Sequence, residues 1–490
     1  MKSDVLMYEK IYKIIKNKIE CGLLPPGSRL PSRSALCREF HTSERTVRRA
    51  VEMLERDGLL KTSQRQRPVV IFEHAKKRIE MPEEHSDPDP KAYELIQSGI
   101  LLFYPVYRRG MQLCRGTEWE IPRTIVSHMD PSYPDEFWRL VNRFWRFFMS
   151  RNENEMIMRV ADSLDFDGIV LWNESWEIRE EYRMALVRLI QTAQSGGEPE
   201  FPQFDYLFKF YSVLSRQEGT GGRCRLASDT SLRLNGKMME QQFRKAEERY
   251  SAVYMDILGL IAIGRYQPGD CLPSHIEMQQ FYGVSVDTTM KAVQILQKMG
   301  VVTAKRGHGI YVDMNLDGLK QIQIDPGLIA CHLRRYLDSL ELITLSIEGV
   351  AAKAAESLTT EEMDALLGDL AEIWEGEHIH QLFPLVLLDF IVRHIPYDIL
   401  RSVYEVLQKN YSIGRSIPKL VNCDKTPESQ KLYDECIEAV SLLRKGQPNA
   451  FGTKTAEVFG EIHRLVVLKC KKLGYWLTAL NVYDGSKFWK

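Results

Sequence analysis

The stretch GSRLPSRSALCREFHTSERTVRRAVEMLERDGLL, residues 27–60, returns in altered form as GDCLPSHIEMQQFYGVSVDTTMKAVQILQKMGVV at residues 269–302. The two copies align over their full length at one fixed offset, with no gap. A repeat at a fixed offset is the sequence signature of a duplicated structural unit. We therefore predict two halves, about 1–245 and 246–490, each with a small N-terminal domain followed by a helical domain.

The similarity continues beyond the small domains, but in a shifting register. Residues 134–148 resemble 360–374, and residues 182–199 resemble 433–448. Each match alone could arise by chance between two amphipathic helices, because their apolar spacing is the same. Their common order along the two halves favours duplication.

Composition places the chain among ordinary globular proteins, with 44% hydrophobic and 27% charged residues. It contains no apolar run of about 18 residues and no secretory signal, so we expect no membrane partner. Nine cysteines without a CxxC pair suggest neither a zinc site nor a disulfide framework. We expect a cytoplasmic protein.

Charge is distributed unevenly between the two small domains. Residues 1–72 contain 15 Lys and Arg against 8 Asp and Glu, whereas residues 250–313 contain 5 against 5. A basic small domain in a chain of net charge −1 fits a polyanionic partner. The alternative is a solvated charged face with no partner.

The first small domain has the pattern of a winged helix-turn-helix. Residues 5–20 carry one apolar helical face, and the proline-rich stretch 23–32 then breaks the helix. Ser32 and Ser43 are placed to cap a second and a third helix, and Gly58 to end the third. Two short β-rich runs follow. The order is three helices and a two-stranded wing, predicted for residues 1–73 and again for 246–314.

In a helix-turn-helix, the N-terminal residues of the second helix of the motif enter the major groove of DNA. In the first copy these are Glu44, Arg45, Thr46, Arg48 and Arg49. Arginine can bind a guanine edge or a phosphate, and threonine can meet a thymine methyl group or a phosphate. The pattern alone equally allows a three-helix unit that only packs against another part of the protein.

These residues resemble the winged-helix domain of the GntR transcriptional regulators over about 65 residues in each copy. The Leu-Pro-Ser entry, the Ser-x-x-Thr-Val-Arg third helix and the Leu-Glu-x-x-Gly-Leu ending of the first copy carry the resemblance, and in the second copy KRGHGIYV (305–312) resembles the family wing. Both copies depart from the family. The arginines usual after the recognition-helix serine and four residues later are Glu44 and Arg48 in the first copy, but Val286 and Met290 in the second.

The first copy therefore retains a basic reading helix, and the second retains the glycine-containing wing. Glycine permits a tight turn and close approach to a groove, and the cationic wing residues can contact phosphates or the minor groove. The candidate DNA contacts are Arg33, Ser43, Arg45, Thr46, Arg48, Arg49, Arg65, Arg67, Ser285, Thr288, Lys291, Lys305, Arg306, Gly307, His308 and Gly309.

The second helical domain, residues 325–490, resembles the helical ligand-binding (FCD) domain of FadR-type GntR regulators through LRRYLDSLELITLSIEGVAAKAAESLTTEEMDAL. The resemblance implies a small-molecule effector, and in many relatives a metal held by one Asp and three His. Here Asp389 matches the Asp, Arg393 replaces the next ligand, Cys436 stands in for another and His463 matches the last. This is a poor ligand set for a divalent ion, so we expect no metal and no cofactor.

The first helical domain, residues 90–216, is aromatic instead. An aromatic-lined ligand pocket is one interpretation and an ordinary helical core is the other. The aromatic residues are Phe103, Tyr104, Tyr107, Trp138, Phe144, Trp145, Phe147, Phe148, Tyr206, Phe208, Phe210 and Tyr211. Residues 217–245 read as a linker between the halves.

The predicted fold is mainly α, with two winged helix-turn-helix domains alternating with two all-helical effector-type domains. The GntR resemblance implies a regulator that binds double-stranded DNA, and the duplication suggests a monomeric pseudo-dimer. Alternatively the neutral copy serves packing or dimerisation, and the whole chain is a homodimer or a ligand-binding scaffold. An enzyme with an aminotransferase-like domain is disfavoured, because no uninterrupted α/β stretch or phosphate loop is present.

Overall fold

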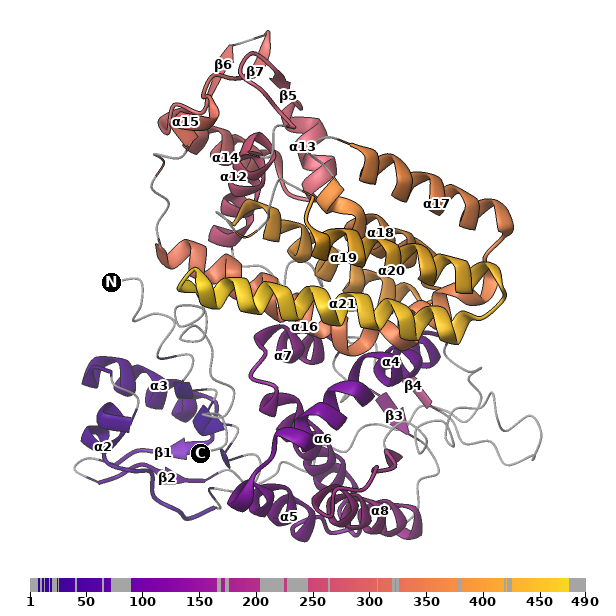
Figure 1. Ribbon diagram of the computed structural model, residues 1–490. Coiled ribbons are helices and arrows are strands. Elements are labelled where there is room, and N and C mark those ends of the chain that lie inside the picture. The colour runs from indigo at the N-terminus through magenta and orange to yellow at the C-terminus, as the bar shows by residue number, and fades with distance from the viewer. Residues whose placement is uncertain are drawn as a thin grey trace.

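The computed structural model describes residues 8, 11, 12, 14–16, 18, 19, 24, 26–39, 42–63, 66–71, 90–164, 169–171, 176–202, 224–226, 246–262, 265–305, 307–319, 322, 326–376, 380–417, 420 and 425–475. Two small domains with separate cores flank a large helical body (Figure 1). Among the described helices, none combines the length and the apolar character needed to cross a bilayer.

Winged helix 1, residues 8–71, has the predicted order of elements. After helical residues between 8 and 19 come α2 (Arg33–Glu39) and α3 (Glu44–Arg56), and then β1 (Leu60–Lys61) pairs antiparallel with β2 (Val69–Val70). Gly58 has φ +72°, the left-handed value expected at the end of the third helix. The apolar faces of the helices and strands form a small core of Tyr8, Ile11, Ile15, Ile19, Leu30, Leu36, Val47, Ala50, Val51, Leu54, Leu59, Leu60 and Val70.

Winged helix 2, residues 246–314, repeats this order with a longer wing. Its helices and strands are α12 (Ala246–Ala262), β5 (Cys271–Leu272), α13 (His275–Tyr282), α14 (Val286–Lys298), β6 (Val302–Lys305) and β7 (Gly309–Val312). The strands form one antiparallel sheet in the order β5-β7-β6. In winged helix 1 the position equivalent to β5 makes only an isolated bridge, between Arg29 and Val69. The two copies thus share one architecture.

Helical domain 1, residues 90–202, contains α4 (Pro90–Leu113), α5 (Glu120–Ser127), α6 (Pro134–Arg151), α7 (Glu155–Leu164) and α8 (Trp176–Gln194). Its aromatic residues form a packed core. The indole Nε1 of Trp145 donates a hydrogen bond of 3.0 Å to the Tyr182 hydroxyl, and the Trp145 ring lies 4.5 Å from that of Tyr107. Phe103, Phe144, Phe147 and Phe148 are buried with them. Tyr206, Phe208, Phe210 and Tyr211 lie outside the described residues.

The predicted linker is wrong at one point. Within residues 217–245, β4 (Cys224–Leu226) pairs antiparallel with β3 (Ile169–Leu171) of the first half. The remainder of that stretch lies outside the described residues. A three-residue strand escapes sequence analysis because its partner is more than 50 residues away.

Helical domain 2, residues 326–475, consists mainly of α16 (Pro326–Ala354), α17 (Thr360–Glu375), α18 (Phe383–His394), α19 (Asp398–Ser412), α20 (Pro427–Arg444) and α21 (Pro448–Lys472). The Thr-x-x-Glu start is a capping box, in which Thr359 and Glu362 bond each other's backbone N–H groups. The long helices α16 and α21 pack closely at Gly452, which has no side chain. A Cβ at this position would be 2.3 Å from the carbonyl oxygen of Glu348.

One hydrophobic core runs through both helical domains. The opening helices α4 and α16 occupy equivalent places in the two halves, and they pack against each other. Helix α4 also packs against α19, and α16 against α7. Such reciprocal contacts are those of an isologous, two-fold interface.

The same contacts correct one sequence pairing. Helix α5 packs on α6 and α8 in the first half, just as α17 packs on α18 and α20 in the second. Helix α17 therefore corresponds to α5, and α18 to α6, whereas the sequence paired residues 134–148 with 360–374. That pairing is wrong because amphipathic helices share an apolar period whatever their place in a fold.

A buried polar cluster joins the two halves at the N-terminus of α7. The Asp338 carboxylate, on α16, lies 2.7 Å from Nε of Arg334 and accepts a 3.0 Å hydrogen bond from the backbone N–H of Glu155. Asn154 donates to the Asp338 carbonyl oxygen at 2.8 Å, and Arg334 donates to the Glu153 carbonyl. Burial raises the pKa of Asp338 to about 7, against the opposing effect of Arg334. Because these charged and polar groups are buried, loss of any one partner should lower the free energy of unfolding.

The reciprocal contact lies nearer the surface. There, Glu94 on α4 accepts a 3.2 Å hydrogen bond from the backbone N–H of Asp398, at the start of α19. Each half thus supplies a carboxylate to the N-terminus of a helix in the other half, where the helix dipole favours negative charge.

These two contacts predict unequal effects. Asp338→Ala would leave Arg334 buried without its counter-ion, and we expect the free energy of unfolding to fall by about 3 kcal/mol. Glu94→Ala, the matched control, is expected to cost less than about 1 kcal/mol. Urea unfolding followed by tryptophan fluorescence measures both. Equal losses would show that the buried cluster does not hold the halves together.

Candidate nucleic-acid interface

The third helix of each winged helix begins with the same cap. Ser43 caps α3 and accepts a hydrogen bond from the backbone N–H of Thr46 at 3.3 Å, while the two hydroxyls lie 2.8 Å apart. In the second copy, Ser285 caps α14 and contacts Thr288 at 3.3 and 2.9 Å. The Ser-x-x-Thr motif therefore positions the recognition helix in both copies, whatever that helix contacts.

An exposed basic face surrounds this cap in winged helix 1. Arg45 and Arg48 project from α3, and Arg33 projects from α2. Arg48 is paired with Glu52 at 3.0 Å and Arg33 lies 4.0 Å from Glu44, both at the surface. Surface ion pairs of this kind are weak, so a phosphate group can replace Glu44 or Glu52 as the partner of these guanidinium groups.

One member of this basic face, Arg38, is absent from the candidates expected from the sequence. Arg38, in the last turn of α2, is exposed and lines a groove with Arg33, Cys37 and Thr42. Its sequence signal was its place on the helix that precedes the recognition helix, since that helix crosses the DNA backbone in helix-turn-helix proteins.

Of the predicted DNA contacts, Thr46 faces the interior, while Arg49 and Lys291 are exposed and also stack on a tyrosine of the first helix. Thr46 is only 4% exposed, because it lies on the core side of α3. The guanidinium of Arg49 lies 3.9 Å above the ring of Tyr8, and Nζ of Lys291 lies 4.0 Å above the ring of Tyr250. These two cation–π contacts occupy equivalent positions, 242 residues apart, and tie the third helix to the first.

The equivalent face of winged helix 2 carries apolar and acidic side chains at the positions of Arg45 and Arg48. Met290, at the position of Arg48, is 40% exposed, and Ile276 is 64% exposed. Asp287 replaces Arg45 and is exposed. His275, at the position of Arg33, is bonded through Nδ1 to the Thr289 hydroxyl at 3.0 Å. This face provides little attraction for a phosphate backbone.

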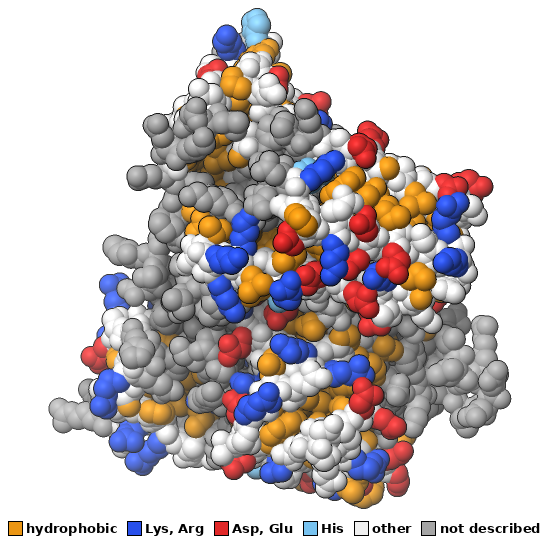
Figure 2. Space-filling model, viewed as in Figure 1, with side chains coloured by type: hydrophobic (Ala, Val, Ile, Leu, Met, Phe, Trp, Pro, Cys, Tyr) orange, Lys and Arg blue, Asp and Glu red, His pale blue; other side chains and the backbone are white. Residues whose placement is uncertain are grey.

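The wing of winged helix 2 is its best candidate for DNA contact. Gly307 and Gly309 have φ of +79° and +114°, values that favour glycine, and a Cβ at Gly309 would be 3.0 Å from Sγ of Cys271. Lys305 and His308 are exposed around this turn, which is closed by a 2.9 Å hydrogen bond from His308 N–H to the Lys305 carbonyl. Figure 2 shows cationic and histidine side chains at this tip, at the far end of the molecule.

The wing strands of winged helix 1 are shorter than those of winged helix 2, and Arg67 is exposed beside β2. Arg65 and Arg306 lie outside the described residues. Among the described residues, most of the exposed positive charge of the first copy is on its helices, and the second copy has fewer exposed cations, namely Arg265, Lys291, Lys298 and Lys305.

The weak metal candidates do not converge. The Asp389 carboxylate is paired with Arg393 at 2.9 Å and accepts a 2.9 Å hydrogen bond from Gln408. Cys436 is fully buried, and burial raises the pKa of its thiol. Burial lowers the pKa of His463. Within the described ranges, no group of three or more His, Cys, Asp or Glu is arranged to hold a metal ion.

Comparison with known families identifies the two small domains. The model of the family "Bacterial regulatory proteins, gntR family" matches residues 7–70 and again 249–312. Both matches coincide with the winged helices of the structure. The two winged helices therefore belong to this family, as their sequence motifs indicate.

Two curated proteins of Bacillus subtilis (strain 168) are similar to parts of the chain. The HTH-type transcriptional regulator LutR is 28% identical over 186 residues, covering 36% of this chain and 82% of LutR. The HTH-type transcriptional regulator TreR is 28% identical over 204 residues, covering 38% of this chain and 80% of TreR. Among solved structures, Streptococcus agalactiae GntR aligns over 44% of this chain and 99% of its own, at 18% identity. Its TM-score of 0.22 is too low to compare the arrangement of domains.

The stacking of Arg49 on Tyr8 predicts that Arg49 stabilises α3, whereas Arg45 on the same helix does not. Arg49→Met would remove the charge above Tyr8, and we expect amide hydrogen exchange along α3 to become about two- to fivefold faster. Arg45→Met, the matched control, removes an exposed charge from the same helix and is expected to leave exchange almost unchanged. Exchange measured by mass spectrometry distinguishes them. Equal acceleration in both variants would rule out a packing role for Arg49.

Proposed function

We propose that this chain, which belongs to the gntR family through both of its winged helices, is a sequence-specific DNA-binding transcriptional regulator built as a covalent pseudo-dimer. The observation that carries the proposal is the presence of two winged helices of one family on a single, reciprocally packed helical body. No cofactor or metal has a part in it, and the family match favours a regulator over an enzyme.

Winged helix 1 is the principal DNA reader in this proposal. Its exposed Arg33, Arg38, Arg45 and Arg48 surround the N-terminus of α3, the end that enters the major groove in helix-turn-helix proteins. Arginine there can pair bidentately with guanine or with a phosphate. Thr46 lies on the core side of α3 and contacts the Ser43 hydroxyl, and the exposed Arg49 ties the helix to Tyr8.

The helical body supports the pseudo-dimer. Two-fold regulators present identical readers to a palindrome, because one sequence makes both subunits. When both copies lie in one chain, that constraint disappears. The second copy could then lose its basic helix and keep its wing, so we infer an asymmetric operator. One half-site is read by α3, and the other is held more weakly through the wing at residues 305–312.

Simultaneous binding places a geometric demand on the chain. The two winged helices lie at different sides of the helical body in Figure 1. Half-sites on one face of a duplex are about one helical turn, roughly 34 Å, apart. The proposal therefore requires winged helix 1, whose core is separate from that of the body, to reorient as a unit when both readers engage one duplex.

A second candidate function has its own observation. Helix α12 packs on the turn formed by Ile413–Ser416, and the Ser251 hydroxyl lies 2.8 Å from Nε2 of His332 in a buried contact with α16. Winged helix 2 is thus anchored to helical domain 2. If it serves only as a packing element, the whole chain would have to dimerise to present two basic copies.

DNA binding should depend on salt and on the basic face. Each phosphate contact contributes about 0.9 to the slope of log affinity against log salt. We expect Arg33→Ala/Arg45→Ala/Arg48→Ala to weaken binding to random-sequence duplex and to flatten this slope by about 2 to 3. Fluorescence anisotropy at three salt concentrations measures both quantities.

The matched control for this variant is on the other copy. His275→Ala/Asp287→Ala/Met290→Ala changes the equivalent positions of winged helix 2 and is expected to leave the salt slope nearly unchanged. A folded wild-type chain that does not bind duplex at low salt would contradict the proposal.

Stoichiometry separates the two candidate functions. A covalent pseudo-dimer should bind a selected duplex as one 56.8 kDa chain, and selection from random DNA should return a non-palindromic site. Light scattering of the protein–DNA complex and sequencing of the selected pool measure these outcomes. Two chains on a perfect palindrome would favour the packing role for winged helix 2.

A further inference from the structure

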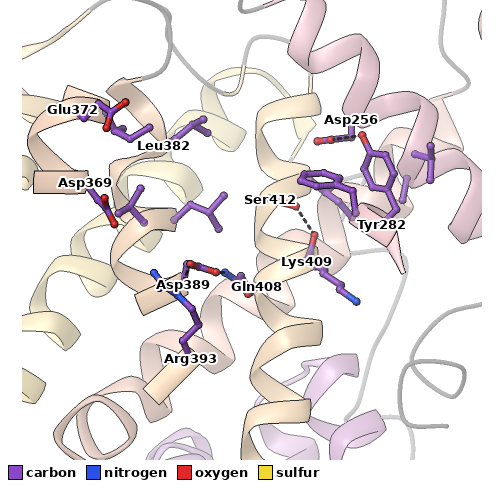
Figure 3. A pocket seen from close by; sticks show the side chains of 17 residues that line it. Asp256, Tyr282, Asp369, Glu372, Leu382, Asp389, Arg393, Gln408, Lys409 and Ser412 are labelled. Atoms are coloured by element: carbon purple, nitrogen blue, oxygen red, sulfur yellow. Dashed lines mark hydrogen bonds and ion pairs between the residues drawn. The ribbon is translucent and has the colours of Figure 1, made fainter. Parts of the chain in front are cut away.

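A cavity lies between winged helix 2 and helical domain 2. Its volume is about 590 Å³, within the range of small-molecule sites. Helices α12 and α13 form one wall, and α17, α18 and α19 form the other. Figure 3 shows Asp256 and Tyr282 on one side of this space and Asp369, Glu372 and Leu382 on the opposite side.

Much of the lining is apolar. Phe281 lies at the cavity with 66% of its surface exposed, an unusual position for a phenylalanine on a folded protein. Opposite it, Ile373, Leu382, Leu385 and Val386 line the wall formed by helical domain 2. Side chains of this kind gain most when an apolar molecule displaces water between them.

The charged lining is predominantly negative. Four carboxylates line the cavity with two cations, Arg393 and Lys409. Arg393 is already paired with Asp389, and Asp256 accepts a 2.9 Å hydrogen bond from the Tyr282 hydroxyl.

Two of these carboxylates have no counter-charge. Asp369 and Glu372 lie one turn apart on α17 and face the cavity (Figure 3). Within the described part of the chain, neither is hydrogen-bonded or ion-paired. Their two charges favour a cation at this end of the cavity and disfavour a carboxylate ligand.

We propose that this cavity binds a small amphipathic organic cation, with its apolar body between Phe281 and Leu385 and its ammonium group at Asp369 and Glu372. The regulatory effect of such a ligand rests on the proposed function, because it acts through DNA binding by winged helix 2. Because the two walls of the cavity belong to different domains, a ligand that fills it favours the arrangement of winged helix 2 that closes around it. The effect would fall on the half-site held by the second wing.

Three probes with the same eight-carbon body and different head groups test the ligand class. Octylammonium, octanoate and 1-octanol are titrated into the full chain by calorimetry, below micelle-forming concentrations. We expect octylammonium to bind more tightly than 1-octanol, and octanoate most weakly. Octanoate binding as tight as that of octylammonium would overturn the assignment of a cation.

Variants locate the binding. Asp369→Asn/Glu372→Gln should weaken octylammonium about three- to tenfold, whereas Glu361→Gln, an exposed carboxylate in the first turn of the same helix, should leave it unchanged. Leu385→Trp should place a bulky ring in the apolar part of the cavity and weaken octylammonium binding. A melting curve shows whether Leu385→Trp is folded. If that variant does not fold, the affinity of Asp369→Asn/Glu372→Gln for octylammonium tests the site. Equal affinities in wild type and Asp369→Asn/Glu372→Gln would overturn the site.

DNA binding separates this inference from the proposed function. Octylammonium is expected to change the affinity for a selected duplex at least about fivefold, and Leu385→Trp to reduce that change. No binding of any probe by a chain that binds DNA would overturn the cavity site alone. Octylammonium binding by a chain that binds no DNA would leave the site standing and overturn the regulatory function.

Discussion

The packing of α4 against α16 is the constraint on which the rest of the molecule depends. These helices open the two helical domains, and their contact merges the apolar surfaces of both halves into one core. Neither half can be removed without exposing a large part of that core to water. The reciprocal contacts of α4 with α19 and of α16 with α7 extend the interface on both sides. The two helical domains therefore share one core and cannot be separated as independent units.

This constraint explains how the two winged helices diverged. Both retain what their own folding needs, namely the Ser-x-x-Thr cap and the cation above a tyrosine of the first helix. The two winged helices differ in their exposed residues. Exposed arginines surround α3, whereas Met290, Asp287 and Ile276 surround α14. Residues that pack within a winged helix are constrained by its own fold. In the proposed covalent pseudo-dimer, exposed residues of the two copies are free to differ, because they need not read identical half-sites.

Sequence analysis located the winged helices well because their signals are local. The caps at Ser32 and Ser43, the left-handed Gly58 and the glycine wing of the second copy are specified by neighbouring residues. Residue type and helix position do not show that Thr46 is buried, or that the exposed Arg49 and Lys291 stack on tyrosines of the first helix. Residues 217–245 also read as a linker along the sequence, although β4 pairs there with β3.

The repeat, the fold of each winged helix and the unequal charge of the two copies follow from the order and spacing of residues along the chain. The correspondence of α17 with α5, the burial of Asp338 and the cavity between winged helix 2 and helical domain 2 depend on how the chain packs in three dimensions. Those features arise where surfaces distant in sequence meet. Asp256, Phe281, Asp369 and Leu385 come from four different helices, and no periodicity along the chain brings them together.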